Sequence, residues 1–190
     1  MVVGILALQG SFAEHHNIVK QLNVNTLLVK TIDELNKVDG LIIPGGESTT
    51  IGKLLKILNL FEPLKEKIKN GFPVYGTCAG LILLAAEIIG ENPHLGLINI
   101  KVKRNAYGRQ LSSFSCNTYV DEFKKEIPLV FIRAPWIESV NDPARIILEL
   151  DGKIVCARQE NILVTSFHPE RTNDTTVHEY FLTMIEEYNK

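Results

Sequence analysis

The sequence lacks both an excess of one charge and any long hydrophobic run. Its 190 residues include 20 Lys and Arg against 22 Asp and Glu, so the formal net charge is −2. Sequence-independent binding of nucleic acid needs many basic contacts to phosphate, so we expect no nucleic-acid partner. The longest uncharged hydrophobic stretch in mid-chain, residues 79–86, is far shorter than the roughly 20 residues that span a bilayer. We therefore expect no membrane association.

Cysteine is also scarce. Cys78, Cys116 and Cys156 are odd in number and widely spaced, which suits neither a disulfide framework nor a metal cluster. The apolar segment 1–8 has no basic residue before it and is typical of a strand rather than of a signal peptide. We expect a cytoplasmic protein without a bound metal. Cys116 and Cys156 lie in strand-like patterns, where a structural role is expected.

No internal repeat and no linker rich in Pro, Gly or Ser divides the chain. Hydrophobic residues make up 45% and charged residues 22%, close to the average of globular domains. This length and composition predict one domain over residues 1–190.

Short apolar runs alternate with helical patterns in the first half. Strands are predicted at 2–8, 25–29, 41–43 and 74–75, with helices at 54–64 and 79–89 and a further helix that Ser11 would cap. This alternation indicates an α/β fold with a mainly parallel central sheet. In the second half, additional strands, which we expect to be antiparallel, are predicted at 98–104, 113–120, 129–133, 146–150, 153–157 and 163–167, before a closing helix at 176–188. Asp151-Gly152 predicts a type I′ hairpin turn.

Gly76-Thr77-Cys78-Ala79-Gly80 has the form of a nucleophile flanked by glycines, between a predicted strand and a predicted helix. A nucleophile on such a strained turn needs small neighbours, and the start of a helix favours the reactive thiolate. The alternative is that Cys78 is a small buried hydrophobic residue, as most free cysteines are. The strand–turn–helix context favours the nucleophile.

His168 is the strongest candidate for the base that a cysteine nucleophile needs. It follows the strand predicted at 163–167, so it should reach the same sheet edge as Cys78. Glu170, two residues further on, could orient its ring and support the imidazolium. The other histidines, His15, His16, His94 and His178, lack this context, and we expect solvent-facing or structural roles for them.

Adjacent glycines follow the strand predicted at 41–43. Gly45 and Gly46 let the backbone turn its N–H groups outward, as an oxyanion hole requires. A phosphate-binding P-loop does not fit, because five residues instead of four separate Gly46 from Gly52-Lys53 and Leu54 replaces the Ser or Thr. A plain glycine turn remains the alternative.

Two further segments are suggestive but weak by themselves. Arg104 begins the cluster 104–109 and could hold a substrate carboxylate, although an arginine in a loop is usually a solvated charge. Ile132 and Arg133 end a predicted strand before a rigid Ala134-Pro135 turn.

Together these motifs resemble the triad-type (class I) glutamine amidotransferases, which hydrolyse the side-chain amide of glutamine. The resemblance is closer to the glutaminase subunits of pyridoxal 5′-phosphate synthase and covers essentially the whole chain. The segments that carry it are residues 4–10, 41–50, 76–85, 92–97, 104–110, 131–135 and 166–170.

The resemblance implies a flavodoxin-like three-layer sandwich and assigns roles to single residues. Cys78 would be the nucleophile, His168 the acid and base, and Glu170 its orienting partner. The residues implied to bind glutamine are Gly46, Glu47, Ser48, Arg104, Ile132 and Arg133, and the backbone N–H groups of Gly46 and Ala79 would hold the oxyanion.

The resemblance also implies a partner and no cofactor. Ammonia would pass to a synthase subunit in a hetero-oligomeric complex, which would use it to make pyridoxal 5′-phosphate. The helix near Glu14 and His15 would be a docking site. Two alternatives stay open: a glutaminase subunit that serves another acceptor enzyme, and a non-catalytic interaction protein of the same fold.

Overall fold

The computed structural model describes residues 1–104 and 113–190. The strands are β1 (Val2–Leu6), β2 (Asn25–Val29), β3 (Gly40–Ile43), β4 (Val74–Thr77), β5 (Ala85–Ile88), β6 (Ile98–Lys103), β7 (Ser113–Val120), β8 (Lys125–Ile132), β9 (Trp136–Val140), β10 (Arg145–Leu150), β11 (Lys153–Gln159) and β12 (Ile162–Thr165). The helices are α1 (Phe12–Gln21), α2 (Ile32–Leu35), α3 (Ser48–Ile57), α4 (Phe61–Lys69), α5 (Ala79–Leu84) and α6 (Thr176–Tyr188), with a 3-10 turn at Pro169–Arg171.

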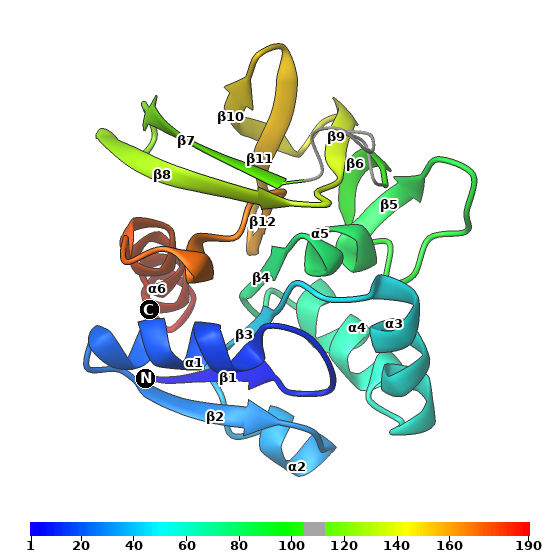
Figure 1. Ribbon diagram of the computed structural model, residues 1–190. Helices are drawn as coiled ribbons and strands as arrows, with labels where there is room; N and C mark the ends of the chain where they lie inside the picture. The colour runs from blue at the N-terminus through cyan, green and yellow to red at the C-terminus, as the bar shows by residue number, and fades with distance from the viewer. Residues whose placement is uncertain (105–112) are drawn as a thin grey trace.

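A ten-stranded sheet forms the centre of the fold (Figure 1). Its order is β2-β1-β3-β4-β12-β11-β9-β6-β5, with β10 paired to β11, while β7 and β8 form a separate two-stranded ribbon. The first five strands in that order are all parallel, as in a flavodoxin-like sheet. Beyond them, β11 runs antiparallel to β12, β9 and β10. The predicted α/β fold, with a mainly parallel sheet and antiparallel strands in the second half, is confirmed.

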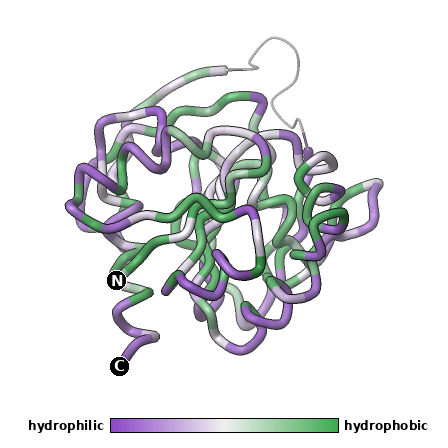
Figure 2. Tube along the Cα trace, turned by 90° about the horizontal axis from the view of Figure 1, so that it is seen from below, coloured by the Kyte–Doolittle hydropathy of each residue, from purple (hydrophilic) through white to green (hydrophobic). Residues whose placement is uncertain are grey.

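Helices cover both faces of the parallel strands because successive strand residues point to opposite sides. On one face, apolar residues of α2, α3, α4 and α5 pack against Leu6, Ile43 and Val74. On the other face, α1 and α6 pack with the β7–β8 ribbon against Ile5 and Tyr75. Figure 2 shows the hydrophobic segments gathered in the interior and the hydrophilic ones on the outer turns. These are the three layers that the resemblance implies.

Two predicted helices are wrong in extent. The helix predicted at 54–64 is two helices, since α3 ends at Ile57 and Asn59 takes a left-handed conformation with φ of 56° before α4 begins. The helix predicted at 79–89 stops at Leu84, and Ala85 starts β5, which pairs with β6. A short continuous apolar run suits a buried helix and a buried strand equally, so periodicity could not find this boundary.

Smaller differences concern element ends. The first strand stops at Leu6 rather than at residue 8, β8 begins at Lys125 rather than at 129, and α2 and β9 were not foreseen. The predicted hairpin is confirmed, because Asp151 and Gly152 have φ of 49° and 72° and Leu150 pairs with Lys153. No helix in the described ranges has the length and apolar character needed to cross a bilayer.

Candidate active site

Cys78 lies on a strained turn between β4 and α5. Its φ of 48° and ψ of −95° are unusual for a residue with a side chain. The flanking glycines are required by contact: a Cβ on Gly76 would lie 2.6 Å from the carbonyl carbon of Gly80, and one on Gly80 would overlap the carbonyl oxygen of Ile43. The predicted elbow is therefore present, with the thiol at the carboxyl end of the sheet.

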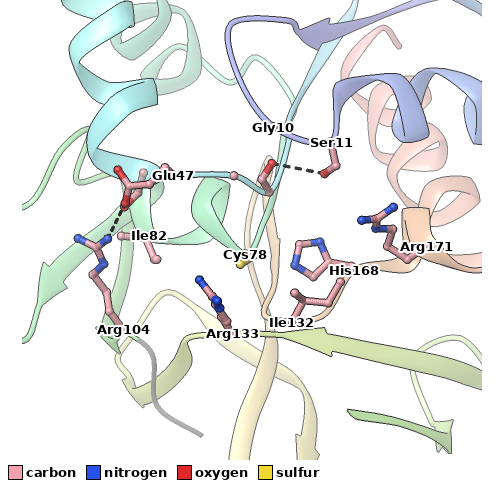
Figure 3. Close-up of a pocket in the computed structure, with 13 residues that line it drawn as sticks. Gly10, Ser11, Glu47, Cys78, Ile82, Arg104, Ile132, Arg133, His168 and Arg171 are labelled. Atoms are coloured by element: carbon pink, nitrogen blue, oxygen red, sulfur yellow. Dashed lines mark hydrogen bonds and ion pairs between the residues drawn. The ribbon is translucent and has the colours of Figure 1, made fainter. Parts of the chain in front are cut away.

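His168 reaches the same edge because its strand is the neighbour of β4. Strands β12 and β4 are parallel, with Thr165 opposite Thr77, and the amide of Cys78 donates to the carbonyl of Thr165 at 2.8 Å. The amide of His168 donates to the carbonyl of Val130 on β8, also at 2.8 Å. In Figure 3 the imidazole faces the sulfur of Cys78 across the pocket floor.

Glu170 completes the group behind His168. Its Oε1 lies 2.7 Å from Nδ1 of His168, which therefore carries the shared proton, and accepts from Oγ of Ser11 at 2.8 Å. Burial lowers the pKa of His168, but Cys78 and Glu170 outweigh burial and raise it to about 10. Burial raises the pKa of Glu170, but His15, His168 and Ser11 outweigh burial and lower it to about 2. At neutral pH the two groups form an imidazolium–carboxylate pair.

The Gly45-Gly46 turn packs closely against His168 and Cys78. A Cβ on Gly45 would overlap Cε1 of His168 and lie 3.5 Å from Cβ of Cys78. The carbonyl oxygen of Gly45 accepts from the amide of Ser11 at 2.9 Å. Since the C=O and N–H of a trans peptide point in opposite directions, the N–H of Gly46 points away from Ser11.

A pocket of about 420 Å³ opens in front of Cys78 (Figure 3). Of the residues predicted as sites, all except Ala79 and Glu170 line it: Gly46, Glu47, Ser48, Cys78, Arg104, Ile132, Arg133 and His168. Ala79 is the first residue of α5, directly after Cys78, where a backbone N–H has no partner within its helix. Glu170 stands behind His168 with a wholly buried side chain.

Charged groups of both signs stand at the pocket. Arg104 donates to Glu47 and to Glu91, each at 2.8 Å, and its side chain is 24% exposed. Glu47 also caps α3 by accepting from the amide of Thr50. The hydroxyl of Ser48 is buried and has no hydrogen-bond partner among the described residues. This arrangement offers a carboxylate, a guanidinium and an unused hydroxyl to a zwitterionic ligand.

Arg133 is held in an unusual conformation beside the pocket. It follows β8 with φ of 46°, in the left-handed region that residues with side chains seldom adopt. Ile132, the last residue of β8, lines the pocket next to it. Strained residues of this kind cluster at ligand sites.

Several residues of the site were missed by sequence reasoning. Ser11 was predicted as a helix cap, but its side chain makes no capping bond and donates instead to Glu170. The side chain of Gln9 accepts a hydrogen bond from the amide of Glu47 at 2.8 Å and so holds the Gly45-Gly46 turn in place. Gly10, Ile82 and Arg171 also line the pocket. For residues 9–11, the sequence did carry one indication: they follow the first predicted strand and so reach the same sheet edge as Cys78.

The other histidines differ from one another. His16 accepts from or donates to Thr26 at 2.8 Å near the surface, and His94 packs against Gly52 outside the pocket, as expected for structural roles. His15, expected at a solvent-facing or core-edge position, is wholly buried beside Glu170, and His178 lies against it. His15 therefore cannot form part of a docking surface, although Glu14 remains at the surface, paired with Arg171.

The rest of the 104–109 cluster, from Asn105 to Arg109, lies outside the described residues. Within the described part of the chain, no group of His, Cys, Asp and Glu is arranged to hold a metal ion. Cys116 and Cys156 are unpaired and lie on β7 and β11, away from the pocket. Burial raises the pKa of both thiols, which suits structural roles.

Comparisons with known proteins identify the family of the chain. A model of the SNO glutamine amidotransferase family matches residues 5–187. The protein named pyridoxal 5′-phosphate synthase subunit PdxT of Fervidobacterium nodosum is 52% identical over 193 residues, covering 100% of both chains. The protein of the same name from Clostridium beijerinckii is 54% identical over 184 residues, covering 96% of this chain and 97% of that one.

Solved structures share the architecture. A crystal structure described as a glutamine amidotransferase superposes with a TM-score of 0.93 at 40% identity, covering 98% of this chain and 100% of that one. The structure of PurLQS from Thermotoga maritima superposes with a TM-score of 0.67 at 15% identity, which demonstrates a common fold.

Proposed function

The chain belongs to the SNO glutamine amidotransferase family, and from this premise we propose that it is the glutaminase subunit of a pyridoxal 5′-phosphate synthase. In this proposal residues 1–190 act as one glutaminase domain, which hydrolyses L-glutamine to L-glutamate and ammonia. The observation that carries the proposal is Cys78 on its strained turn beside the His168–Glu170 pair, at the floor of a pocket that also holds Glu47 and Arg104.

The first chemical step forms a thioester. His168 already holds the proton that the Cys78 thiol gives up, so the step starts from an imidazolium, which the raised pKa of His168 favours. The thiolate attacks the side-chain amide carbon of glutamine, forming the S–C bond. His168 then returns its proton to the amide nitrogen, the C–N bond breaks and ammonia leaves. Glu170 keeps the imidazole oriented and supports its positive charge throughout.

The second step hydrolyses the thioester. His168, now neutral, accepts a proton from water as the water oxygen attacks the carbonyl carbon. The C–S bond breaks, glutamate leaves and the Cys78 thiolate is restored beside an imidazolium. The residues that act on the bonds are in the chain, so this half-reaction calls for no cofactor.

Backbone donors stabilise the negative oxygen in both steps. The N–H of Gly46, which points away from Ser11, and the N–H of Ala79 at the start of α5 are the proposed donors. Gln9 supports this role, since its side chain holds the loop through the amide of Glu47.

The two ends of the glutamine backbone have complementary groups at the pocket. Glu47 suits the α-ammonium group of glutamine and Arg104 suits its α-carboxylate. These two side chains form a 2.8 Å ion pair, and in the proposal each would bind one end of the substrate backbone. The buried hydroxyl of Ser48 and the strained backbone at Ile132 and Arg133 complete the proposed glutamine site.

The proposed partner is the synthase subunit that uses the ammonia. The relatives named above carry the name of that synthase. We propose that the complex works in the cytoplasm. Free ammonia would be protonated there, so a glutaminase is useful only when it is docked to the enzyme that uses the ammonia. Docking would occur near the pocket, where Glu14 of α1 pairs with Arg171 at 3.1 Å.

The roles of the triad are tested by measuring glutamate release from glutamine by the chain alone and after adding a pyridoxal 5′-phosphate synthase subunit. We expect release to rise on mixing and Cys78→Ala to abolish it, whereas Cys116→Ala, which removes a thiol away from the pocket, leaves it unchanged. A glutamine analogue with an electrophilic diazoketone should label Cys78 alone. Release by Cys78→Ala at the normal rate would refute the mechanism.

The acceptor is tested by the same mixing experiment. Activity that ignores the synthase subunit would keep the glutaminase and reject the proposed partner, in favour of another acceptor enzyme. No release under either condition would favour the non-catalytic alternative.

The oxyanion role of Gly46 needs a matched pair of variants. A Cβ there would overlap Oε1 of Gln9, so Gly46→Ala and Gly46→Pro share that disturbance, whereas the proline variant alone also loses the N–H. We expect kcat of the proline variant to be lower than that of the alanine variant by about 10²- to 10³-fold. Equal kcat values would exclude the Gly46 N–H as a donor.

A further inference from the structure

Two buried histidines that the mechanism above does not use lie directly behind Glu170. His15 on α1 is 0% exposed and His178 on α6 is 1% exposed. Nδ1 of His15 lies 2.9 Å from Nε2 of His178. Nε2 of His15 lies 3.2 Å from Oγ1 of Thr77 and 3.4 Å from Oε2 of Glu170. A line of polar groups therefore runs from His168 through Glu170 and His15 to His178.

Both buried histidines are neutral at physiological pH. Burial, with a smaller contribution from His15, lowers the pKa of His178 to about 3, although Glu170 opposes the shift. Burial also lowers the pKa of His15. The other charged or titratable groups that act on His15 are Glu170, His168, Glu14 and His178, and the ring of Tyr75 lies edge-on at 6.2 Å. A neutral imidazole has one N–H and one lone pair, so the tautomers decide what each ring can do.

The surroundings favour one pair of tautomers. Nδ1 of His178 has no hydrogen-bond partner within the described part of the chain, so a proton placed there would be a buried donor without an acceptor. The proton of His178 therefore belongs on Nε2, where it is donated to Nδ1 of His15. The proton of His15 is then on Nε2, facing Thr77 and Oε2 of Glu170. The opposite choice would turn a lone pair of His15 toward a carboxylate 3.4 Å away.

Oε2 of Glu170 needs such a donor. Its other oxygen, Oε1, is shared by His168 and Ser11, while Oε2 is buried and makes no aligned hydrogen bond among the residues described. The N–H of His15 is the group that faces it. Because this donor is neutral, it can hold the carboxylate in place without cancelling the charge that supports the His168 imidazolium.

We propose that His15 is a positioning residue for Glu170, with its donor tautomer fixed by His178. The proposal rests on the roles proposed above for Cys78, His168 and Glu170. Thr77 joins the same group, and it directly precedes Cys78, so the network holds the nucleophile turn and the carboxylate together. Loss of His15 should weaken the support of the imidazolium rather than the binding of glutamine.

The test compares His15→Met, which removes the donor, with His15→Gln, whose amide places an N–H near the position of Nε2. In the glutaminase–synthase complex, His15→Met should lower kcat by about tenfold with KM unchanged. The alkaline limb of the pH profile of kcat/KM should move down by about one pH unit, since the limb follows the pKa of His168. His15→Gln should restore most of both.

Controls separate this proposal from a loss of fold or of the triad. His16→Gln changes the neighbouring histidine, whose Nδ1 lies 2.8 Å from Thr26, and should leave the profile unchanged. His178→Met should move the alkaline limb in the same direction by less, and it carries the test if His15→Met does not fold. An alkaline limb that stays in place in His15→Met, or in His178→Met if only that variant folds, would overturn the proposal. Retained activity in Cys78→Ala would instead refute the proposed function itself.

Discussion

His168 stands between two regions that are built differently. On one side lies the pocket region, made of loop backbone at Gly45 and Gly46 and of charged side chains such as Glu47 and Arg104. On the side of Nδ1 lies the buried region, where Glu170 contacts Ser11 and His15, and His15 in turn contacts Thr77 and His178. The first region is open to a ligand, and the second is closed to water.

This difference separates binding from proton control. Exposed ion pairs contribute little to stability, so the Arg104–Glu47 pair can rearrange around a substrate at low cost. A buried carboxylate, by contrast, is stable only with its hydrogen bonds in place, and those bonds set the pKa of the neighbouring histidine. Changes in the pocket region should therefore affect KM or the stabilisation of the oxyanion. Changes in the buried region should affect the pH profile of kcat/KM.

The largest expected effect comes from forcing the two regions apart at the point where they meet. In Gly45→Ala the new methyl group overlaps the His168 ring and must push it or the loop away. We expect kcat/KM for glutamine to fall by about 10²- to 10³-fold, as small displacements of catalytic groups do. Steady-state glutamate release by the complex measures this change.

The control for that variant is Gly90→Ala. It also adds a methyl group, but into open space, and its cost is limited to backbone strain at φ of 80°. It should lower the melting temperature slightly and leave kcat/KM intact. A Gly45→Ala variant with normal kinetics would mean that the tight contact with His168 is dispensable.

A smaller effect is expected from Ser11→Ala, which alters the buried region alone. The variant removes the hydroxyl that donates to Oε1 of Glu170 at 2.8 Å. We expect kcat to fall about tenfold and the free energy of unfolding to fall by about 1 kcal/mol, the usual contribution of one hydrogen bond. KM should not change. Ser115→Ala, at an exposed position of β7, is the control and should leave kcat unchanged. A rise in KM for Ser11→Ala would place Ser11 in the pocket region instead.

The buried region should also affect the pH dependence of stability. Because the folded-state pKa of His178 is about 3, below its ordinary value of 6.5, the unfolded chain binds more protons between these values. Stability contributed by neutral His178 is therefore present above pH 6.5 and is lost as the pH falls toward 3. Between pH 7 and pH 5 this amounts to about 2 kcal/mol.

Urea unfolding of the wild type and of His178→Met at several pH values measures this slope. The variant should lose less stability on acidification, whatever its stability at pH 7. Equal slopes for both proteins would show that the pKa of His178 does not change on folding, contrary to the lowered pKa given above.

The triad of this site could be predicted from sequence, and the polar groups behind Glu170 could not. Cys78 and His168 each follow a strand, and parallel strands bring their carboxyl ends to one edge, so local patterns were sufficient. His15 and His178 are separated by 163 residues and meet only because α1 and α6 cover the same face of the sheet. Ser11 satisfied the rules for a helix cap, and the long-range bond to Glu170 that replaces the cap has no local signature.

The fold, too, could be predicted only in part. Alternating strands and helices determine the parallel half, whereas the boundary between α5 and β5 depends on pairing between Ala85 and Ile98. That pairing joins segments whose apolar composition suits either structure. Tertiary contact, rather than local preference, decides the outcome there.

The ladder between β4 and β12 has a consequence for how freely this sequence can change. Cys78 directly follows β4 and His168 lies three residues beyond the end of β12, and these two strands are paired in register, so the main chain brings the nucleophile and the base to one edge of the sheet. The alignment of nucleophile and base is thus a property of the main chain. Side chains of the core can be exchanged through evolution or design without disturbing it, as long as the ladder does not slip by a residue. Such a slip would turn the side chains of the displaced strand to the opposite face of the sheet.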